Sequence, residues 1–172
     1  ALHSAVAGGG DIILIPEIPY DISKIISGVE YRKKHGRNFT IIAVAEGAVS
    51  ITDAVLSEEE RRAAKQAAGH STISYHLASE LERLTGQETR VTIPGHYQRG
   101  GPPCPYDRIL ATQFGTAAAK LIMEQKYGYM VGIQNGQILP VPLGDAASRT
   151  KFLPTDHPLI QVARDVGIYF GD

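Results

Sequence analysis

The segment Gly95–Arg108 holds the side chains of this 172-residue chain that are best suited to chemistry. It places His96 and Arg99 three residues apart, with Gly95 before them and Gly100 after them. A guanidinium can bind phosphate or carboxylate in a bidentate way, and histidine adds a donor whose charge changes near neutral pH. The glycines allow a sharp turn and close approach of a ligand. Residue chemistry alone leaves two interpretations open, a phosphate-binding loop and a plain surface loop.

The elements around this loop decide how its side chains are held. Short apolar runs indicate strands buried on both faces, and apolar residues spaced three and four apart indicate helices with one buried face. The predicted strands are 11–15, 39–45 and 89–93, followed by a hairpin of 129–133 and 138–143. The predicted helices are 22–35, 57–68, 77–86, 107–126 and 157–166. Strands that alternate with helices favour an α/β layered fold with a mainly parallel sheet.

Several polar side chains are placed to cap these helices. Asp21 or Ser23 can cap the first of the helices just named. Ser57 and Glu60 have the spacing of a capping box, and Asp156 is the expected cap of the last helix. These caps support the predicted boundaries.

Composition excludes several classes of function. The net charge of −1 gives no broad electrostatic footprint for nucleic acid. There is no apolar run long enough to span a membrane and no signal-peptide pattern at the start. The single Cys104 allows no internal disulfide, which fits a reducing, cytoplasmic location. The histidines lack metal-ligand spacing, so we predict no metal site on this chain. From the charge and the lack of a long apolar run, we predict no nucleic-acid partner and no membrane partner.

Three parts of the chain, taken together, resemble the 6-phosphofructokinase family. They are the loop segment 95–111, the paired segments 14–21 and 41–48, and the segment 130–136. They occur in the family's order, and the resemblance covers roughly residues 5 to 145. The resemblance favours the phosphate-binding interpretation of the loop.

The resemblance implies a three-layer, Rossmann-like phosphofructokinase fold with a mainly parallel sheet, present here in part. Residues 1–99 would form most of the sugar-phosphate lobe, and residues 100–147 would complete the nucleotide lobe. Residues 148–172 would return to the first lobe with a C-terminal helix. The first ten residues read as the end of a helix running into glycines, without a methionine or a cap. We therefore expect the chain to be the C-terminal fragment of a longer polypeptide.

The resemblance also assigns roles to single residues. His96 and Arg99 would hold the 6-phosphate of fructose 6-phosphate, and Glu46 would contact the sugar. From the residues alone, Glu46 is better explained as a charge stabilised by a helix start than as a sugar ligand. Arg90 would reach a neighbouring subunit's substrate, so the site would be shared in a homo-oligomer, with a homotetramer expected.

Two further positions are implied as effector-binding residues of an allosteric enzyme. Glu17 aligns with a glutamate that helps bind a regulatory nucleotide and its metal, and Arg37 falls near the family's basic effector residues. A solvated basic helix end explains Arg37 equally well.

Phosphoryl transfer needs a phosphate-cradling loop, a metal-binding carboxylate and an aspartate that accepts the hydroxyl proton. In the family these lie ahead of Ala1, so this chain would bind the substrate and hold no catalytic residue. The intact enzyme would phosphorylate fructose 6-phosphate at C1 in glycolysis, with Mg²⁺ and ATP. Two alternatives stay open: pyrophosphate as the donor, and a non-catalytic phosphosugar-binding subunit.

The helix predicted at 107–126 carries an apolar face that would normally pack on a sheet from the absent half. An exposed apolar face of this size usually finds another surface. We therefore expect association between copies, or with a separate N-terminal fragment.

Overall fold

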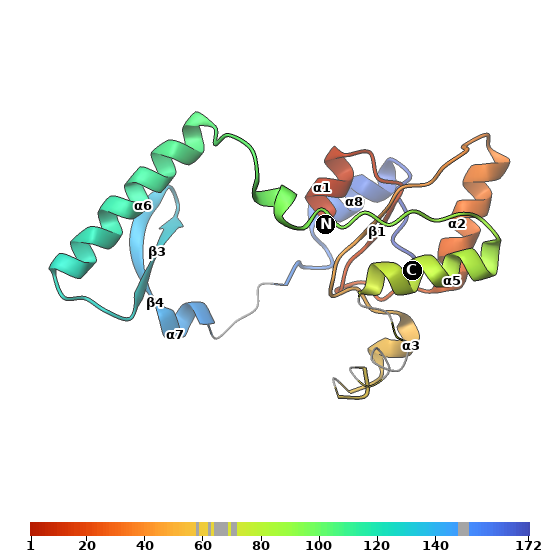
Figure 1. Cartoon of the computed structure of the whole chain (residues 1–172), viewed down its shortest axis with the longest axis horizontal. Helices are drawn as coiled ribbons and strands as arrows, with labels where there is room; N and C mark the ends of the chain where they lie inside the picture. Colours follow the sequence, from red (N-terminus) through yellow and green to blue (C-terminus); the bar gives the residue numbers. More distant parts are fainter. Residues whose placement is uncertain (58, 62, 64–68, 70–71, 148–151) are drawn as a thin grey trace. The chain divides into compact units, whose positions relative to one another are not determined.

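The computed structural model describes residues 1–57, 59–61, 63, 69, 72–147 and 152–172 (Figure 1). These residues fall into two compact units. Unit 1 contains Ala1–Thr92 and Phe152–Asp172, and unit 2 contains Ile93–Lys151. Within the described ranges, none of the helices has both the length and the apolar character needed to cross a bilayer. The assignment of the segments to sugar-phosphate and nucleotide lobes stays a prediction.

A short parallel sheet lies at the centre of unit 1. Strand β1 (Ile12–Leu14) pairs in parallel with β2 (Ile42–Val44), and all residues of β1 are fully buried. The C-terminal segment adds one parallel bridge on the other edge, between Ile12 and Tyr169. The first two predicted strands are thus confirmed, although each is only three residues long.

Helices cover both faces of this sheet. They are α1 (Leu2–Ala7), α2 (Ile22–Lys34), α5 (Ile73–Thr85) and α8 (Pro158–Asp165), and a short α3 (Ile51–Ala54) follows β2. Ile13 packs with residues of α1 and α8, whereas Ile12 and Leu14 pack with residues of α2 and α5. Alternate residues of one strand therefore enter two separate hydrophobic clusters. This helix–sheet–helix arrangement confirms the predicted α/β layered fold.

The structure confirms the predicted cap of α2 and contradicts the predicted cap of α8. Asp21 Oδ1 accepts hydrogen bonds from the backbone N of Ser23 at 2.8 Å and from its Oγ at 2.6 Å. These bonds hold the pKa of Asp21 below its ordinary value, because they stabilise the charged carboxylate. The prediction of Asp156 as the cap of α8 is wrong, because α8 begins directly after His157. There His157 Nδ1 accepts from the backbone N of Leu159 at 3.1 Å.

The capping box predicted at Ser57 and Glu60 is present. The Ser57 backbone N donates to Glu60 Oε2 at 2.8 Å, and the Glu60 backbone N donates to Ser57 Oγ at 3.3 Å. Most of the helix predicted from there to residue 68 lies outside the described residues.

An ion pair joins the start of β1 to the end of α2. Arg32 Nη2 lies 2.7 Å from Asp11 Oδ1, and the two side chains are only 18% and 15% exposed. Asp11 Oδ2 also accepts from the backbone N of Ile41 at 2.8 Å, and Arg32 Nε donates to Thr40 Oγ1 at 3.3 Å. This single pair therefore ties together β1, α2 and the segment that leads into β2.

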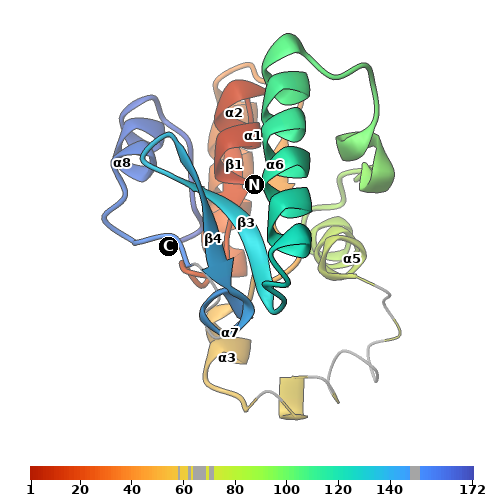
Figure 2. The same cartoon turned by 90° about the vertical axis from the view of Figure 1, so that its left-hand side faces the viewer.

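Unit 2 is a long helix lying along a hairpin (Figure 2). Its elements are η1 (Gly95–Arg99), α6 (Pro105–Met123), β3 (Tyr129–Gln134), β4 (Gln137–Pro142) and α7 (Leu143–Ala147). Asn135 and Gly136 have φ values of 50° and 77°, as a two-residue hairpin turn with the twist of the strands requires. The predicted hairpin is confirmed. Helix α6 contains no buried residue, and Ile109 and Ile122 are both 62% exposed.

The predicted strand at 89–93 is wrong. Residues 86–94 have no regular secondary structure, and in the described part of the chain no strand pairs with them. A strand needs a neighbour that takes its backbone hydrogen bonds. The β-branched residues of 89–93 favour a strand, but a local sequence does not show whether a second strand lies beside it.

We expect Asp11→Ala to lower the free energy of unfolding by about 2 kcal/mol, because Arg32 and the Ile41 amide lose a half-buried acceptor. Glu88→Ala is a matched control, since the Glu88–Arg90 pair is exposed and should contribute less than about 1 kcal/mol. Urea denaturation of both variants measures the difference. Equal losses would contradict the assigned role of the Asp11–Arg32 pair.

The lowered pKa of Asp21 predicts a pH dependence. A carboxylate whose pKa is lowered by folding stabilises the protein above its unfolded pKa of about 3.9, and this stabilisation is lost as pH falls through the folded pKa. Asp21→Asn keeps a capping oxygen but no longer titrates. We expect the variant to lose less stability than the wild type on acidification below about pH 4. Denaturant titrations at several pH values measure the free energy of unfolding of both proteins. If it fell equally with pH in the wild type and in Asp21→Asn, Asp21 would not be the source of the pH dependence.

Candidate functional site

Two turns meet at the carboxyl edge of the unit 1 sheet. After β1, the backbone N of Ile18 donates to the carbonyl of Ile15 at 3.2 Å, and after β2 that of Ala48 donates to Ala45 at 3.0 Å. The turns are adjacent, because a Cβ added at Gly47 would lie 3.6 Å from two side-chain atoms of Pro16. In parallel α/β sheets this edge is where ligands bind. The turns carry the two predicted carboxylates, one each.

Glu46 lies in the turn after β2 and is exposed. The residue before it is bonded to β1, because the Ala45 backbone N donates to the carbonyl of Leu14 at 2.9 Å. This bond fixes the backbone where Glu46 begins. An exposed carboxylate on a fixed turn can accept hydrogen bonds from sugar hydroxyls. The geometry permits the predicted role of Glu46 and does not test it.

Glu17, in the turn after β1, already has a partner within unit 1. Its Oε1 accepts a hydrogen bond from the backbone N of Leu153 at 2.9 Å, across 136 residues of sequence. This bond fastens the start of the C-terminal segment of unit 1 to the edge of the sheet. The effector-binding role of Glu17 stays a prediction, and a ligand there would compete with Leu153 for this oxygen.

Arg37 and its neighbours form the basic end of α2. The Arg37 backbone N donates to the carbonyl of Arg32 at 3.0 Å, and the Arg37 side chain is exposed. His35 Nδ1 lies 2.8 Å from the carbonyl of Tyr31, and the two rings lie 4.1 Å apart. The predicted effector role of Arg37 remains open beside its role as a cation at a helix C-terminus.

Arg90 lies in the extended segment after α5 and is 85% exposed. Its Nε donates to Glu88 Oε1 at 2.9 Å, in a pair that solvent screens strongly. No hydrogen bond or ion pair joins Arg90 to Glu46 in the part of unit 1 that the structure describes. Arg90 is therefore a long cation directed to solvent, available to a ligand or a neighbouring molecule.

His96 lies in unit 2, on the single-turn helix η1. This turn is closed by the Tyr97 N to Pro94 O bond of 2.9 Å, and φ is positive at Gly95 (50°) and Gly101 (88°) on either side. A 3₁₀-helix has three residues per turn, so positions 96 and 99 share one side of η1. The His96 side chain is exposed. The side chain of Arg99 lies outside the described part of the structure.

The four predicted substrate residues thus divide between the two units. Glu46 and Arg90 belong to unit 1, and His96 and Arg99 belong to unit 2. Glu46, Arg90 and His96 are exposed, as ligand-binding residues usually are.

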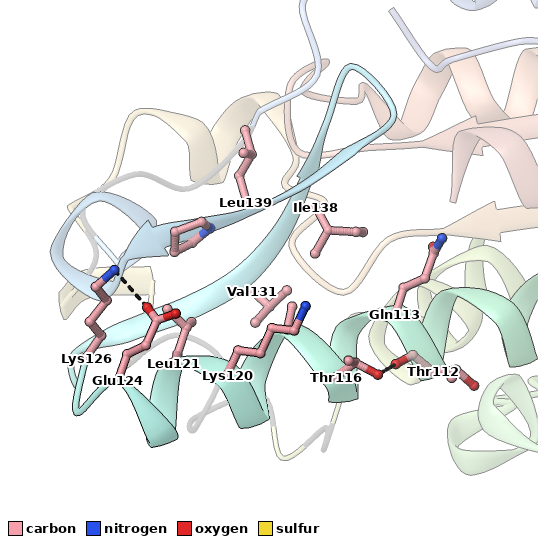
Figure 3. Close-up of a pocket in the computed structure, with 12 residues that line it drawn as sticks. Thr112, Gln113, Thr116, Lys120, Leu121, Glu124, Lys126, Val131, Ile138 and Leu139 are labelled. Carbon is pink, nitrogen blue, oxygen red and sulfur yellow. Dashed lines mark hydrogen bonds and ion pairs between the residues drawn. The ribbon is translucent and has the colours of Figure 1, made fainter.

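A groove of about 560 Å³ lies within unit 2, between α6 and the hairpin (Figure 3). Leu121, Val131 and Ile138 form apolar walls, and a Glu124–Lys126 ion pair of 2.8 Å lies at one end. That bond lowers the pKa of Glu124 and raises the pKa of Lys126. None of the predicted substrate residues lines the groove.

Mg²⁺ is held by carboxylates together with phosphate oxygens. Across the described ranges, no three His, Cys, Asp or Glu side chains converge to form a metal site. No chemical step is assigned to a metal on this chain.

Comparisons with known proteins agree with these features. A family model described as "Phosphofructokinase" matches residues 1–122. The chain is 49% identical over 172 residues to an ATP-dependent 6-phosphofructokinase of Spirochaeta thermophila, and 42% identical to one of Propionibacterium freudenreichii. Each match includes the whole of this chain, but only 47% of the Spirochaeta relative and 51% of the Propionibacterium relative. The chain therefore belongs to the phosphofructokinase family, and it spans about half the length of these curated relatives.

Solved structures show the same fold. The chain matches the Pichia pastoris phosphofructokinase in the T-state with a TM-score of 0.56 and 30% identity, covering 96% of this chain and 17% of that one. It also matches a pyrophosphate-dependent phosphofructokinase of Nitrosospira multiformis with a TM-score of 0.60, covering 94% of this chain and 41% of the other. At 18% identity, this second likeness shows the fold alone. The resemblance read from the sequence motifs is confirmed.

The Glu17–Leu153 bond could not be found from the sequence. Its partner is a backbone amide, which every residue except proline offers, and it lies 136 residues away. No local pattern marks such a contact. The Asp11–Arg32 pair was also missed, although a charge at a strand start and another at a helix end were visible in the sequence.

We expect Glu17→Ala to raise the hydrogen-exchange rate of the Leu153 amide by at least about tenfold, because the amide loses its acceptor. Glu17→Gln is the matched control, since its carbonyl oxygen can still accept the bond. Amide exchange followed by NMR measures both variants. Unchanged exchange at Leu153 in Glu17→Ala would show that the bond does not hold this segment.

Proposed function

We propose that this chain forms the substrate-binding part of an ATP-dependent 6-phosphofructokinase. The complete enzyme would transfer a phosphoryl group from ATP to the C1 hydroxyl of fructose 6-phosphate, giving fructose 1,6-bisphosphate in the cytoplasm. The observation that carries this proposal is the 49% identity, over the whole chain, to a relative of that name. The loop of Gly95–Gly101 supports it with the residue types that a phosphosugar requires.

In this proposal His96 and Arg99 bind the 6-phosphate. Arginine offers a planar fork of donors that matches phosphate oxygens, and histidine adds a further donor. The two positions are three residues apart on η1, the repeat of a 3₁₀-helix, so one ligand could be reached from both. Binding the phosphate end fixes the opposite end of the sugar for reaction, and this positioning is the chain's main contribution to the rate.

Glu46 is proposed to bind the sugar itself. As an exposed carboxylate on the turn after β2 it can accept from two hydroxyls, which orients the ring relative to the phosphate anchor. MgATP, bound by other parts of the complete enzyme, supplies the phosphoryl group. The residues of this chain bind and orient, and none of them is proposed to accept the hydroxyl proton.

Arg90 is proposed to complete the substrate site of a neighbouring subunit in a homo-oligomer. Its 85% exposed side chain is engaged only by an exposed glutamate two residues away, so a phosphate could displace that partner at small cost. Glu17, in the turn after β1, and Arg37, at the basic end of α2, are each proposed to serve in binding an effector. A regulatory nucleotide would compete for the Glu17 carboxylate.

A chimera tests the substrate assignment. This chain replaces the matching 47% of the Spirochaeta thermophila relative, and activity is measured with ATP and with pyrophosphate as donors. We expect Arg99→Ala to raise the KM for fructose 6-phosphate by roughly 30-fold, since losing a charge-assisted phosphate contact costs about 2 kcal/mol. Arg83→Ala, an exposed arginine on α5, should leave the KM unchanged.

An unchanged KM in Arg99→Ala would refute the role of the loop. Turnover with pyrophosphate and not with ATP would replace the proposed donor. A chimera that binds fructose 6-phosphate without turnover under either donor would favour a non-catalytic binding subunit.

Subunit mixing tests the shared site. If Arg90 and Arg99 of one site come from different subunits, hybrids of Arg90→Ala and Arg99→Ala contain sites in which neither residue is altered. At a fructose 6-phosphate concentration far below the raised KM of either variant, we expect co-refolded mixtures of the two chimeras to recover up to about a quarter of wild-type activity, as random pairing predicts. Arg90→Ala mixed with Arg90→Ala should recover none. No recovery in the hybrid would place both residues in a site within one subunit.

A further inference from the structure

The start of α8 depends on the side chain of His157. The first helical residue, Pro158, has no N–H that needs a partner. The Ile160 backbone N donates to the carbonyl of His157 at 2.9 Å. The Leu159 backbone N donates instead to the ring of His157, at 3.1 Å from Nδ1. The imidazole thus takes the place of the carbonyl that a helix start lacks.

This hydrogen bond requires one form of the imidazole. An amide can only donate, so His157 Nδ1 must carry a lone pair and the ring proton must lie on Nε2. Protonation of the ring places a proton on Nδ1 and removes the acceptor. It also places a positive charge at the N-terminus of a helix, where the dipole favours negative charge. The cap therefore holds only while His157 is neutral.

A second histidine, at the C-terminus of α2, has the opposite chemistry. His35 Nδ1 lies 2.8 Å from the carbonyl of Tyr31, and a carbonyl can only accept. Nδ1 of His35 therefore carries the proton, and the bond survives when the ring gains a second one. The helix dipole also favours a cation at this end. The chain thus contains its own control for the cap of α8.

One further titratable ring lies beside that of His157. His3 of α1 has its ring centroid 6.5 Å from that of His157, with the two planes at 66°. A positive charge on His3 would therefore repel one on His157. The described charged groups of α8, of the segments on either side of it and of the turn after β1 are Asp156, Arg164, Asp165, Asp172 and Glu17. All of them are retained in the variants used below, so the comparison isolates His157.

The capped helix supports one of the two hydrophobic clusters of unit 1. Ile160 and Ala163 of α8 are buried in the cluster that contains Ile13 of β1, and Leu159 packs against the same cluster. The amide that depends on the cap therefore belongs to a residue that touches the core. Loss of the cap frees the first turn of α8 and weakens the packing of one layer on the sheet.

We propose that His157 is a pH-sensitive helix cap, which holds the start of α8 to unit 1 as a neutral imidazole and releases it as an imidazolium. The stabilisation is present at higher pH and is lost as pH falls, because only the neutral ring accepts the bond. Histidine ordinarily changes charge near pH 6.5, so the cap responds to mild acidification. This response is a property of the fold and requires neither substrate nor effector.

The first test is the neutral tautomer of each ring, read from ¹H–¹⁵N correlation spectra of the chain at about pH 8, where an ordinary histidine is neutral. We expect the Nε2–H form at His157 and the Nδ1–H form at His35. The two rings are compared in one sample, so differences in conditions do not enter.

The second test is hydrogen exchange at the Leu159 amide, expressed as the ratio of its intrinsic to its observed exchange rate. We expect this protection factor to fall by about fivefold between about pH 8 and about pH 5.5. In His157→Asn the cap keeps an acceptor that does not titrate, so the factor should stay constant over the same range. In His157→Ala the factor should be low at both pH values.

Four results would overturn the proposal. They are the Nδ1–H tautomer at neutral His157, a wild-type protection factor that is independent of pH, an equal fall in the wild type and in His157→Asn, and a factor in His157→Ala that equals the wild-type value at about pH 8. If His157→Ala does not fold, the comparison of the wild type with His157→Asn decides the question.

Discussion

The complete burial of β1 is the constraint on which unit 1 depends. Its alternate side chains pack into two clusters, one shared with α1 and α8 and the other with α2 and α5. A strand buried on both faces cannot shift its register without exposing apolar residues to the wrong layer. The turn that follows β1 is therefore fixed, and so is the adjacent turn after β2. Glu17 and Glu46 owe their positions to this packing, although neither belongs to the core.

Unit 2 is organised by different forces. It has a confirmed hairpin and a long helix, but its apolar side chains remain largely exposed, and the loop that we propose to bind phosphate precedes the helix. The loop is local and needs only its glycines, whereas the hairpin needs neighbours. This contrast explains why the loop proposed to bind substrate can be noticed from a few neighbouring residues.

The sequence predicted those features that depend on local pattern. The apolar run of β1, the Asp21 cap, the Asn135-Gly136 turn and the motif around His96 and Arg99 each follow from residues close together in the chain. The failures concern long-range partners. Residues 89–93 have strand-like composition but no strand beside them, and Glu17 bonds to an amide 136 residues away. Both outcomes depend on which segments meet in space, and a single sequence does not carry that information.

The central claim is that the loop of Gly95–Gly101 binds the phosphate of a phosphosugar. A crystal structure of the chimeric enzyme with fructose 6-phosphate tests it most directly. The account predicts the 6-phosphate within hydrogen-bond distance of His96 and Arg99, with Glu46 on the sugar hydroxyls. A 6-phosphate bound elsewhere, with this loop free of ligand, would contradict it.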